Sequence, residues 1–241
     1  MKIEETFGIL KNHLKSEIFK NNLFGTNISI RCKALSPEEA IGNPEARDYP
    51  IIKGKEVMVE ANFLGAKGQA FTGSFENADY KIEELLQLDF SDIKKRTSFI
   101  AALNAIYRYL KLTDKTVHCK DEEPKECAEN LTSVLPENRK IFLVGFQPRF
   151  FEFLAKNRQI RVVDRDEDNI GKTKFGVTIE SAERTEEFIE WCDMIFVTGS
   201  TVVNGTITKF LNAKKPVIFY GVTISAAAKI LHLDSYCFNG H

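Results

Sequence analysis

"MIFVTGSTVVNGTITKFLNAKKPVIFY" runs from Met194 to Tyr220 and contains the pattern that decides the fold. Two apolar runs, MIFV and VIFY, stand at its ends, and a polar turn and the helix-like stretch TITKFLNA lie between them. Continuous Val, Ile and Phe runs are typical of strands that are buried on both faces of a sheet. A strand, a helix and a second strand in this order predict a right-handed βαβ unit with parallel strands.

The same alternation fills the rest of the C-terminal half. Further strands are predicted by the apolar runs KIFLVGF (140–146) and QIRVVD (159–164). Helices are predicted by the spacing of apolar residues in FFEFLAKN (150–157) and TEEFIEWC (185–192). Strands that alternate with helices are typical of α/β proteins. We therefore predict a Rossmann-like domain with a parallel sheet over residues 139–241.

The N-terminal half has a different rhythm, typical of an α+β domain over residues 1–115. Apolar residues recur every three or four positions over 3–19, which predicts an amphipathic helix. Residues 26–35 alternate in the manner of a strand, and a capping box starting at Ser36 predicts a short helix after it. Two strands should meet in a hairpin near 65–68, and the alanine-rich segment 93–110 predicts a well-packed helix.

Residues 116–138 separate the two halves. They lose the apolar periodicity, gain charge, and contain Pro124 and Pro136. Such a composition is typical of a boundary between domains. We predict a charged connector here.

Composition narrows the classes of function. The chain has 241 residues, with 33 Lys and Arg against 34 Asp and Glu, so its net charge of −1 lacks the basic excess of most nucleic-acid-binding proteins. No apolar run approaches the roughly 20 residues that span a bilayer. The five cysteines are scattered and odd in number, which favours reduced thiols and a cytoplasmic protein. We expect a small-molecule ligand, no nucleic acid and no membrane, and a homodimer as the assembly to consider.

The carboxyl edge of the predicted parallel sheet is where a ligand should bind, because crossovers diverge there. Four places follow strands at this edge: Gly145, Asp164, the turn Thr198–Thr206, and Gly221. The turn contains the predicted ligand-binding residues Thr198, Gly199, Ser200, Thr201, Asn204, Gly205 and Thr206. Hydroxyl and N–H groups near a helix start suit an anion, but the same residues can also cap the following helix. The turn carries more donors than one cap needs.

Asp164 raises the alternative of a nucleotide-binding site. It lies 19 residues after Gly145, close to the spacing at which dinucleotide folds place an acid on the ribose. However, "GFQPRF" replaces the G-x-G-x-x-G fingerprint after the first strand. NAD and FAD are therefore disfavoured, and S-adenosylmethionine or a mononucleotide remains open as the ligand of an enzyme. No residue can be named as a general base.

His118, Cys119 and Cys127 form the one cluster of soft metal ligands visible in the sequence. Thiolates and imidazole suit transition metals, but structural zinc sites use tighter cysteine spacing and four ligands. A fourth ligand would have to come from elsewhere, for example Cys32. The other reading is an exposed connector with incidental thiols.

Three segments carry a resemblance to a known family: EANFLGAKGQAFTG (60–73), IAALNAIYRYL (100–110) and VTGSTVVNGTITKFL (197–211). In this order they resemble a family of uncharacterised proteins named for heavy-metal chelation. The most specific part of the resemblance is the pattern T-G-[ST]-T-x-x-N-G-T, which this chain matches from Thr198 to Thr206. The next most specific part is Asn104 in the segment 100–110. The resemblance implies an enolase-N-terminal-like domain followed by a Rossmann-like domain. One departure is "YGVTISAAAKIL", which stands where members often have a G-P-[ST]-x-P-like loop.

These observations lead to one principal hypothesis. The protein should bind a small anionic or metal-chelating ligand in a cleft between its halves, in heavy-metal chelation or metal-cofactor metabolism. The Thr198–Thr206 turn would hold ligand oxygens, and Asn104 would approach from the first half. A transition metal or a nucleotide-like molecule is the cofactor to consider.

Overall fold

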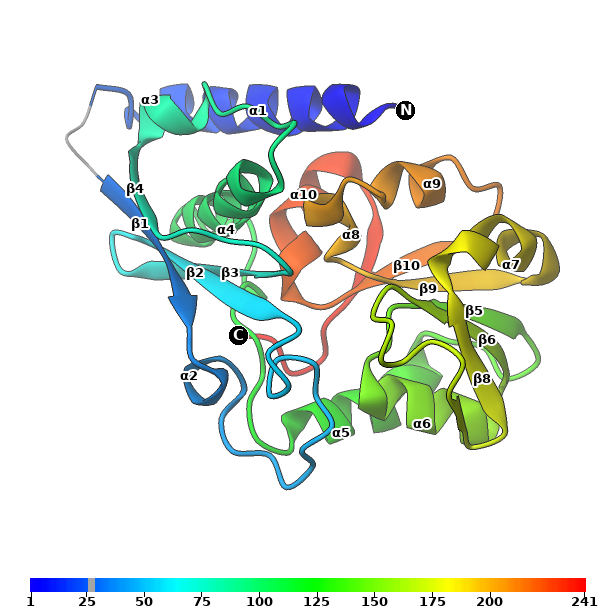
Figure 1. Cartoon of the computed structure of the whole chain (residues 1–241). Coiled ribbons are helices and arrows are strands. Elements are labelled where there is room, and N and C mark those ends of the chain that lie inside the picture. The colour runs from blue at the N-terminus through cyan, green and yellow to red at the C-terminus, as the bar shows by residue number, and fades with distance from the viewer. Residues whose placement is uncertain (26–28) are drawn as a thin grey trace.

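The computed structural model describes residues 1–25 and 29–241 as two sheets with helices around them (Figure 1). The helices are α1 (Ile3–Lys20), α2 (Pro37–Ile41), α3 (Ile82–Leu85), α4 (Ile93–Tyr109), α5 (Glu123–Glu129), α6 (Pro148–Asn157), α7 (Thr185–Trp191), α8 (Thr201–Asn204), α9 (Ile207–Leu211) and α10 (Ser225–Leu231). Single 3-10 turns are η1 (Asn130–Ser133), η2 (Ala182–Arg184) and η3 (Val222–Ile224). The strands are β1 (Ser29–Leu35), β2 (Val57–Phe63), β3 (Ala66–Thr72), β4 (Ala78–Lys81), β5 (Lys140–Val144), β6 (Gln159–Asp164), β7 (Thr173–Lys174), β8 (Val177–Ser181), β9 (Met194–Thr198), β10 (Val217–Tyr220) and β11 (Asp234–Tyr236).

The first half forms an antiparallel sheet in the order β3-β2-β1-β4. The predicted hairpin is confirmed: Phe63 pairs with Ala66, and Leu64 and Gly65 turn the chain with positive φ angles of 52° and 86°. The predicted capping box is also confirmed, because the Ser36 hydroxyl accepts the Glu39 N–H. The strand predicted over residues 26–35 is observed as β1, which begins at Ser29. Residues 26–28 of the prediction lie outside the described part of the chain.

The second half forms a sheet in the order β11-β10-β9-β5-β6-β8-β7, parallel except for the β7–β8 pair. This confirms the α/β prediction. Alternate residues of β5 pack on opposite faces: Ile141 and Leu143 join the cluster that contains α6, and Phe142 joins the cluster that contains α7. Helices thus cover both faces, which explains the continuous apolar runs. The strands β7, β8 and β11 were not predicted because their sequences are short and largely polar.

Helix α4 joins the two halves. Its residues from Thr97 to Tyr107 are all buried, and it packs against β2 and β3 on one side and against α8 and α10 on the other (Figure 1). Gly68 permits this contact, because a Cβ atom there would lie 2.2 Å from the backbone nitrogen of Ala105. One hydrophobic cluster therefore contains core residues of both halves, such as Phe99 and Phe219.

Residues 116–138 contact both halves: the Gln69 N–H donates to the Thr116 carbonyl, and the Asp121 N–H donates to the Ile41 carbonyl. Cys119, Cys127, Leu131 and Leu135 are buried in the cluster that also contains α6. The two thiols are therefore buried, in contrast to the reading in which they lie on an exposed connector. Periodicity did not show this packing because α5, EPKECAE, contains no large apolar residue.

Within the described ranges, no helix combines the length and the apolar character needed to cross a membrane.

Candidate functional site

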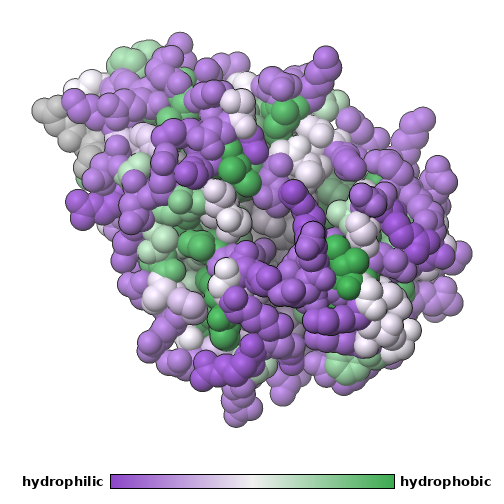
Figure 2. Space-filling view, viewed as in Figure 1, coloured by the Kyte–Doolittle hydropathy of each residue, from purple (hydrophilic) through white to green (hydrophobic). Residues whose placement is uncertain are grey.

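A cavity of about 820 Å³ lies between the two halves, at the carboxyl ends of β5, β6, β9 and β10. Several residues between Tyr49 and Ser74 in the first half line it, including Glu56 and Phe71. In Figure 2 the molecule is hollowed near the middle of the visible face, and mostly hydrophilic residues surround the hollow. The sheet-edge prediction of a site is consistent with this cavity.

The structure divides the predicted ligand-binding residues into two groups. Those that line the cavity are Gly145, Asp164, Thr198, Ser200, Thr201, Asn204, Thr206 and Gly221. Those that do not are Asn104, Gly199 and Gly205. The two glycines have packing roles: a Cβ atom on Gly199 would lie 2.9 Å from Ile224, and Gly205 ends α8 in the left-handed conformation.

Asn104 does not have its predicted role of contacting a ligand in the cavity. Its side chain is fully buried, and its Nδ2 donates to the carbonyl oxygens of Gln69 (3.0 Å), Val222 (3.2 Å) and Thr223 (3.2 Å). Its Oδ1 accepts the Ala226 N–H at 2.9 Å. With these partners the amide ties the first half to the loop after β10 and does not reach the cavity.

The Thr198–Thr206 turn both starts a helix and forms a wall of the cavity. The Thr201 hydroxyl donates to the Thr198 carbonyl at 2.8 Å, and the hydroxyls of Thr198 and Ser200 lie 2.9 Å apart. The predicted side-chain cap is not observed, because neither Ser200 before α8 nor Thr206 before α9 accepts a helix N–H through its side chain. Gly145 packs beneath it, because a Cβ atom on this residue would lie 2.9 Å from Thr198 and 3.0 Å from the Tyr220 hydroxyl.

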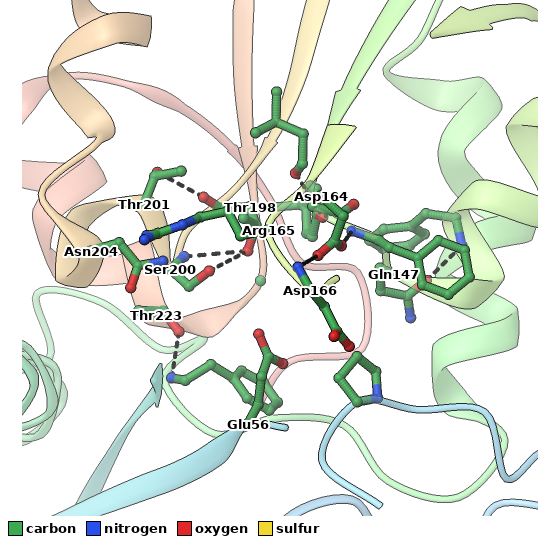
Figure 3. A pocket seen from close by; sticks show the side chains of 18 of the residues that line it. Glu56, Gln147, Asp164, Arg165, Asp166, Thr198, Ser200, Thr201, Asn204 and Thr223 are labelled. Atoms are coloured by element: carbon green, nitrogen blue, oxygen red, sulfur yellow. Dashed lines mark hydrogen bonds between the residues drawn. The ribbon is translucent and has the colours of Figure 1, made fainter. Parts of the chain in front are cut away.

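Asn204 and Arg165 are two donor side chains that line the cavity without a protein partner. The Asn204 amide and the Arg165 guanidinium make no side-chain hydrogen bond or ion pair with any residue that the structure describes. In Figure 3 the Arg165 side chain extends toward Thr201 and Asn204. Arginine presents a rigid fork of N–H donors that matches carboxylate and phosphate oxygens. This wall can therefore receive an anion.

The opposite wall is acidic. Asp164 is held by backbone donors, since its two carboxylate oxygens accept the N–H groups of Phe146 at 2.6 Å and Asp166 at 2.7 Å. Glu56 enters from the first half and points toward the middle of the cavity (Figure 3). Glu56 is half-buried, and the protein around it shields its carboxyl group from water. This desolvation, followed by the charges of Asp164 and Asp166, raises the pKa of Glu56 to about 7.

Lys55 closes the acidic wall toward solvent. Its ammonium group lies 2.6 Å from the Asp168 carboxylate and 3.8 Å from that of Asp166. This pair links the segment before β2 to the loop after β6.

A sulfur-rich end of the cavity contains all three predicted metal ligands, His118, Cys119 and Cys127, together with Cys237. Burial lowers the pKa of His118 to about 4, so its imidazole is neutral, and its Nδ1 contacts the Cys119 carbonyl. Cys32 is far from this end, with its sulfur 3.8 Å from the Ser98 carbonyl. Over residues 1–25 and 29–241, no three His, Cys, Asp or Glu side chains are arranged to hold a metal ion. The donor set therefore does not fit a metal centre.

The sequence analysis did not single out several of the lining residues, among them Glu56, Arg165 and Cys237. Arg165 follows Asp164 directly at the end of β6, so the sheet-edge rule could have found it. Glu56 precedes β2 in the other half, and Cys237 follows the last strand. No local pattern indicates that either meets the cavity.

Comparisons with known proteins concern family and fold. The model of the DUF364 family, described as "Putative heavy-metal chelation", matches residues 130–233. A solved structure from Pyrococcus horikoshii, a DUF364 protein of unknown function, is similar at a TM-score of 0.57 and 16% identity, covering 90% of this chain and 79% of that one. Another DUF364 protein of unknown function, from Desulfitobacterium hafniense, is similar at a TM-score of 0.50 and 14% identity, covering 73% of this chain and 72% of that one. No curated protein matches. At these identities the solved structures show the fold alone.

Proposed function

We propose that the protein binds a small multidentate acid, of the kind that chelates metal ions, in the cavity between its halves. The observation that carries this proposal is the pair of unpartnered donors, Arg165 and Asn204, on the wall next to the Thr198–Thr206 turn. Arg165 is exposed and Asn204 is half-buried, so an acidic ligand would replace water at both donors and gain a charge-assisted hydrogen bond from the guanidinium. The match to the heavy-metal chelation family supports a ligand of this chemical class.

Glu56 supports an acidic ligand as well. With a pKa of about 7 it carries a proton in a large share of molecules at neutral pH. A protonated carboxyl group can donate a hydrogen bond to a ligand oxygen, whereas an ionised one would repel it. The wall opposite Arg165 thus tolerates an anion despite its carboxylates.

The ligand's oxygens would meet three kinds of group in this proposal. The guanidinium of Arg165 would supply charge, the amide of Asn204 would supply a neutral donor, and the Ser200 hydroxyl would complete the contact. Thr201 would position the turn, because its hydroxyl is engaged with the Thr198 carbonyl. The parallel sheet supports a Rossmann-like assignment of the second half, and the packing of α4 on the antiparallel sheet supports an enolase-N-terminal-like first half.

Native mass spectrometry with elemental analysis of untagged protein tests the proposal. We expect a retained acidic molecule, or stabilisation by added citrate or inorganic phosphate, in wild type. The double variant Arg165→Ala/Asn204→Ala should lose both effects. Arg31→Ala is the matched control, because Arg31 is exposed and pairs with Asp79 far from the cavity.

Three results would overturn the proposal: equal stabilisation of wild type and the double variant, stabilisation of wild type by neutral compounds alone, or neither a retained molecule nor any response.

A further inference from the structure

The segment between α2 and β2 crosses from the first half of the molecule toward the second. In Figure 1 it leaves α2, extends toward α5 and then returns to β2. We call its residues 46–55 the strap. Tyr49, Pro50 and Lys55 of the strap line the cavity, and so does Glu56, which follows directly. The strap therefore forms one side of the proposed acid site.

The backbone of the strap is free of its neighbours. Just before the strap, the N–H groups of Asn43 and Glu45 donate to the side chains of Asp121 (2.8 Å) and Glu122 (3.0 Å). Over residues 46–55, every backbone hydrogen bond in the described structure stays within the strap. A segment without backbone bonds to its surroundings opens at a lower cost in free energy than a strand within a sheet.

A small apolar cluster attaches the strap to the first half. Tyr49 and Ile51 are buried there with Leu35, Ile41 and Met58. This cluster is separate from the main core that joins the two halves through α4. The strap can therefore move without repacking the main core.

Two ion pairs attach the strap to the second half. The Arg149 guanidinium, at the start of α6, donates to both carboxylate oxygens of Asp48 at 2.9 Å and lies 5.9 Å from the centre of the Tyr49 ring. The Lys55 ammonium lies 2.6 Å from the Asp168 carboxylate in the loop after β6. Ion pairs that water can reach contribute little free energy each, so these two attachments break readily.

We propose that the strap is a lid, which parts from the second half to admit a ligand and closes over it again. The loop after β6 connects this movement to the ligand, because Arg165 directly precedes Asp166, whose carboxylate lies 3.8 Å from Lys55. An acid bound to Arg165 would hold this loop where Lys55 reaches it. This coupling rests on the proposed function, whereas the lid itself rests on the two ion pairs and the free backbone.

Limited trypsin digestion of the full chain tests the lid, with cleavage after the exposed Lys53 followed by mass spectrometry. The protease needs the surrounding chain to detach, so the rate of this cut follows the population of the open strap. Arg149→Ala should speed the cut roughly fivefold. Neither Arg149 nor Asp48 lines the cavity, so the variant changes no proposed ligand contact. Lys156→Ala is the matched control, because it removes an ion pair to Glu152 on the same helix and should leave the rate unchanged.

Asp168→Asn keeps the test decisive if Arg149→Ala fails to fold. Within the described chain the Asp168 carboxylate forms an ion pair only with Lys55. Because both side chains of this pair are more exposed than those of Arg149 and Asp48, we expect a smaller increase, roughly twofold. An unchanged rate after Lys53 in both variants, or an equal increase in Lys156→Ala, would overturn the lid.

Added citrate distinguishes the lid from the acid site. It should slow the cut after Lys53 in wild type and leave the rate in Arg165→Ala/Asn204→Ala unchanged. A free peptide substrate in the same digestion reports any effect of citrate on trypsin itself. If citrate does not slow the cut in wild type while Arg149→Ala still speeds it, the lid stands and its coupling to an acid is wrong.

Discussion

Two asparagines show how differently the halves meet in two regions of the molecule. Asn104 lies in a closed seam, where its amide has four hydrogen-bond partners and no exposed surface. Asn204 lies at the open cavity, where its amide has no partner among the described residues. The same side chain thus holds the halves together in one place and remains available in the other. Residue type alone does not distinguish a structural amide from a binding amide; the partners do.

Among the substitutions that test this comparison, Asn104→Ala should lower the free energy of unfolding the most. It removes all four hydrogen bonds and takes a donor from the carbonyls of Gln69 and Thr223, while the Val222 carbonyl keeps the Ser225 hydroxyl at 2.9 Å. We expect a loss of about 4 kcal/mol in the free energy of unfolding, measured by urea denaturation. The matched change Asn204→Ala should cost less than about 0.5 kcal/mol, because no protein contact is lost. Equal losses would erase the distinction between seam and cavity.

Gly68→Ala should destabilise the seam through a steric clash between β3 and α4. Its Cβ atom would meet the backbone of Ala105 at 2.2 Å, and neither β3 nor α4 can move without repacking the core. We expect a cost of about 3 kcal/mol by thermal unfolding. Gly73→Ala is the control, because open space surrounds that position. A native-like Tm for Gly68→Ala would show that the seam is loosely packed.

Glu56→Gln should change how stability depends on pH. Folding raises the pKa of this carboxyl from 4.5 to about 7, so the folded state binds the proton more tightly than the unfolded state. The contribution of Glu56 to the free energy of unfolding should therefore be most favourable below pH 4.5, and it should be lost as the pH rises through 7. We expect the variant to be more stable by about 2 kcal/mol at pH 8. Parallel pH profiles of Tm for the two proteins would contradict the raised pKa.

The sequence predicted the fold class better than the site. Apolar runs identified β5, β6, β9 and β10, and their parallel order placed a cavity at their carboxyl ends. Those predictions depend on local periodicity, which the sequence displays directly. The partners of Asn104 and the approach of Glu56 depend on contacts between distant segments. Arg165 is the exception, since it follows a predicted strand end and was overlooked.

Arg165→Ala should have the smallest effect on stability and a specific effect on binding. The guanidinium makes no ion pair in the described structure, so the free energy of unfolding should change by less than about 0.5 kcal/mol. A ligand at 100 times its dissociation constant adds about 2.7 kcal/mol to wild type, and the variant should show much less. A large loss of stability without ligand would instead make Arg165 part of the seam.

A thermal-shift titration with citrate and inorganic phosphate tests the central claim most directly, using wild type, Arg165→Ala/Asn204→Ala and the Arg31→Ala control. We predict that wild type and the control gain Tm with increasing anion, while the double variant starts at a similar Tm and gains little. An equal gain in all three proteins, or none in any, would contradict the claim that the open cavity binds an acid.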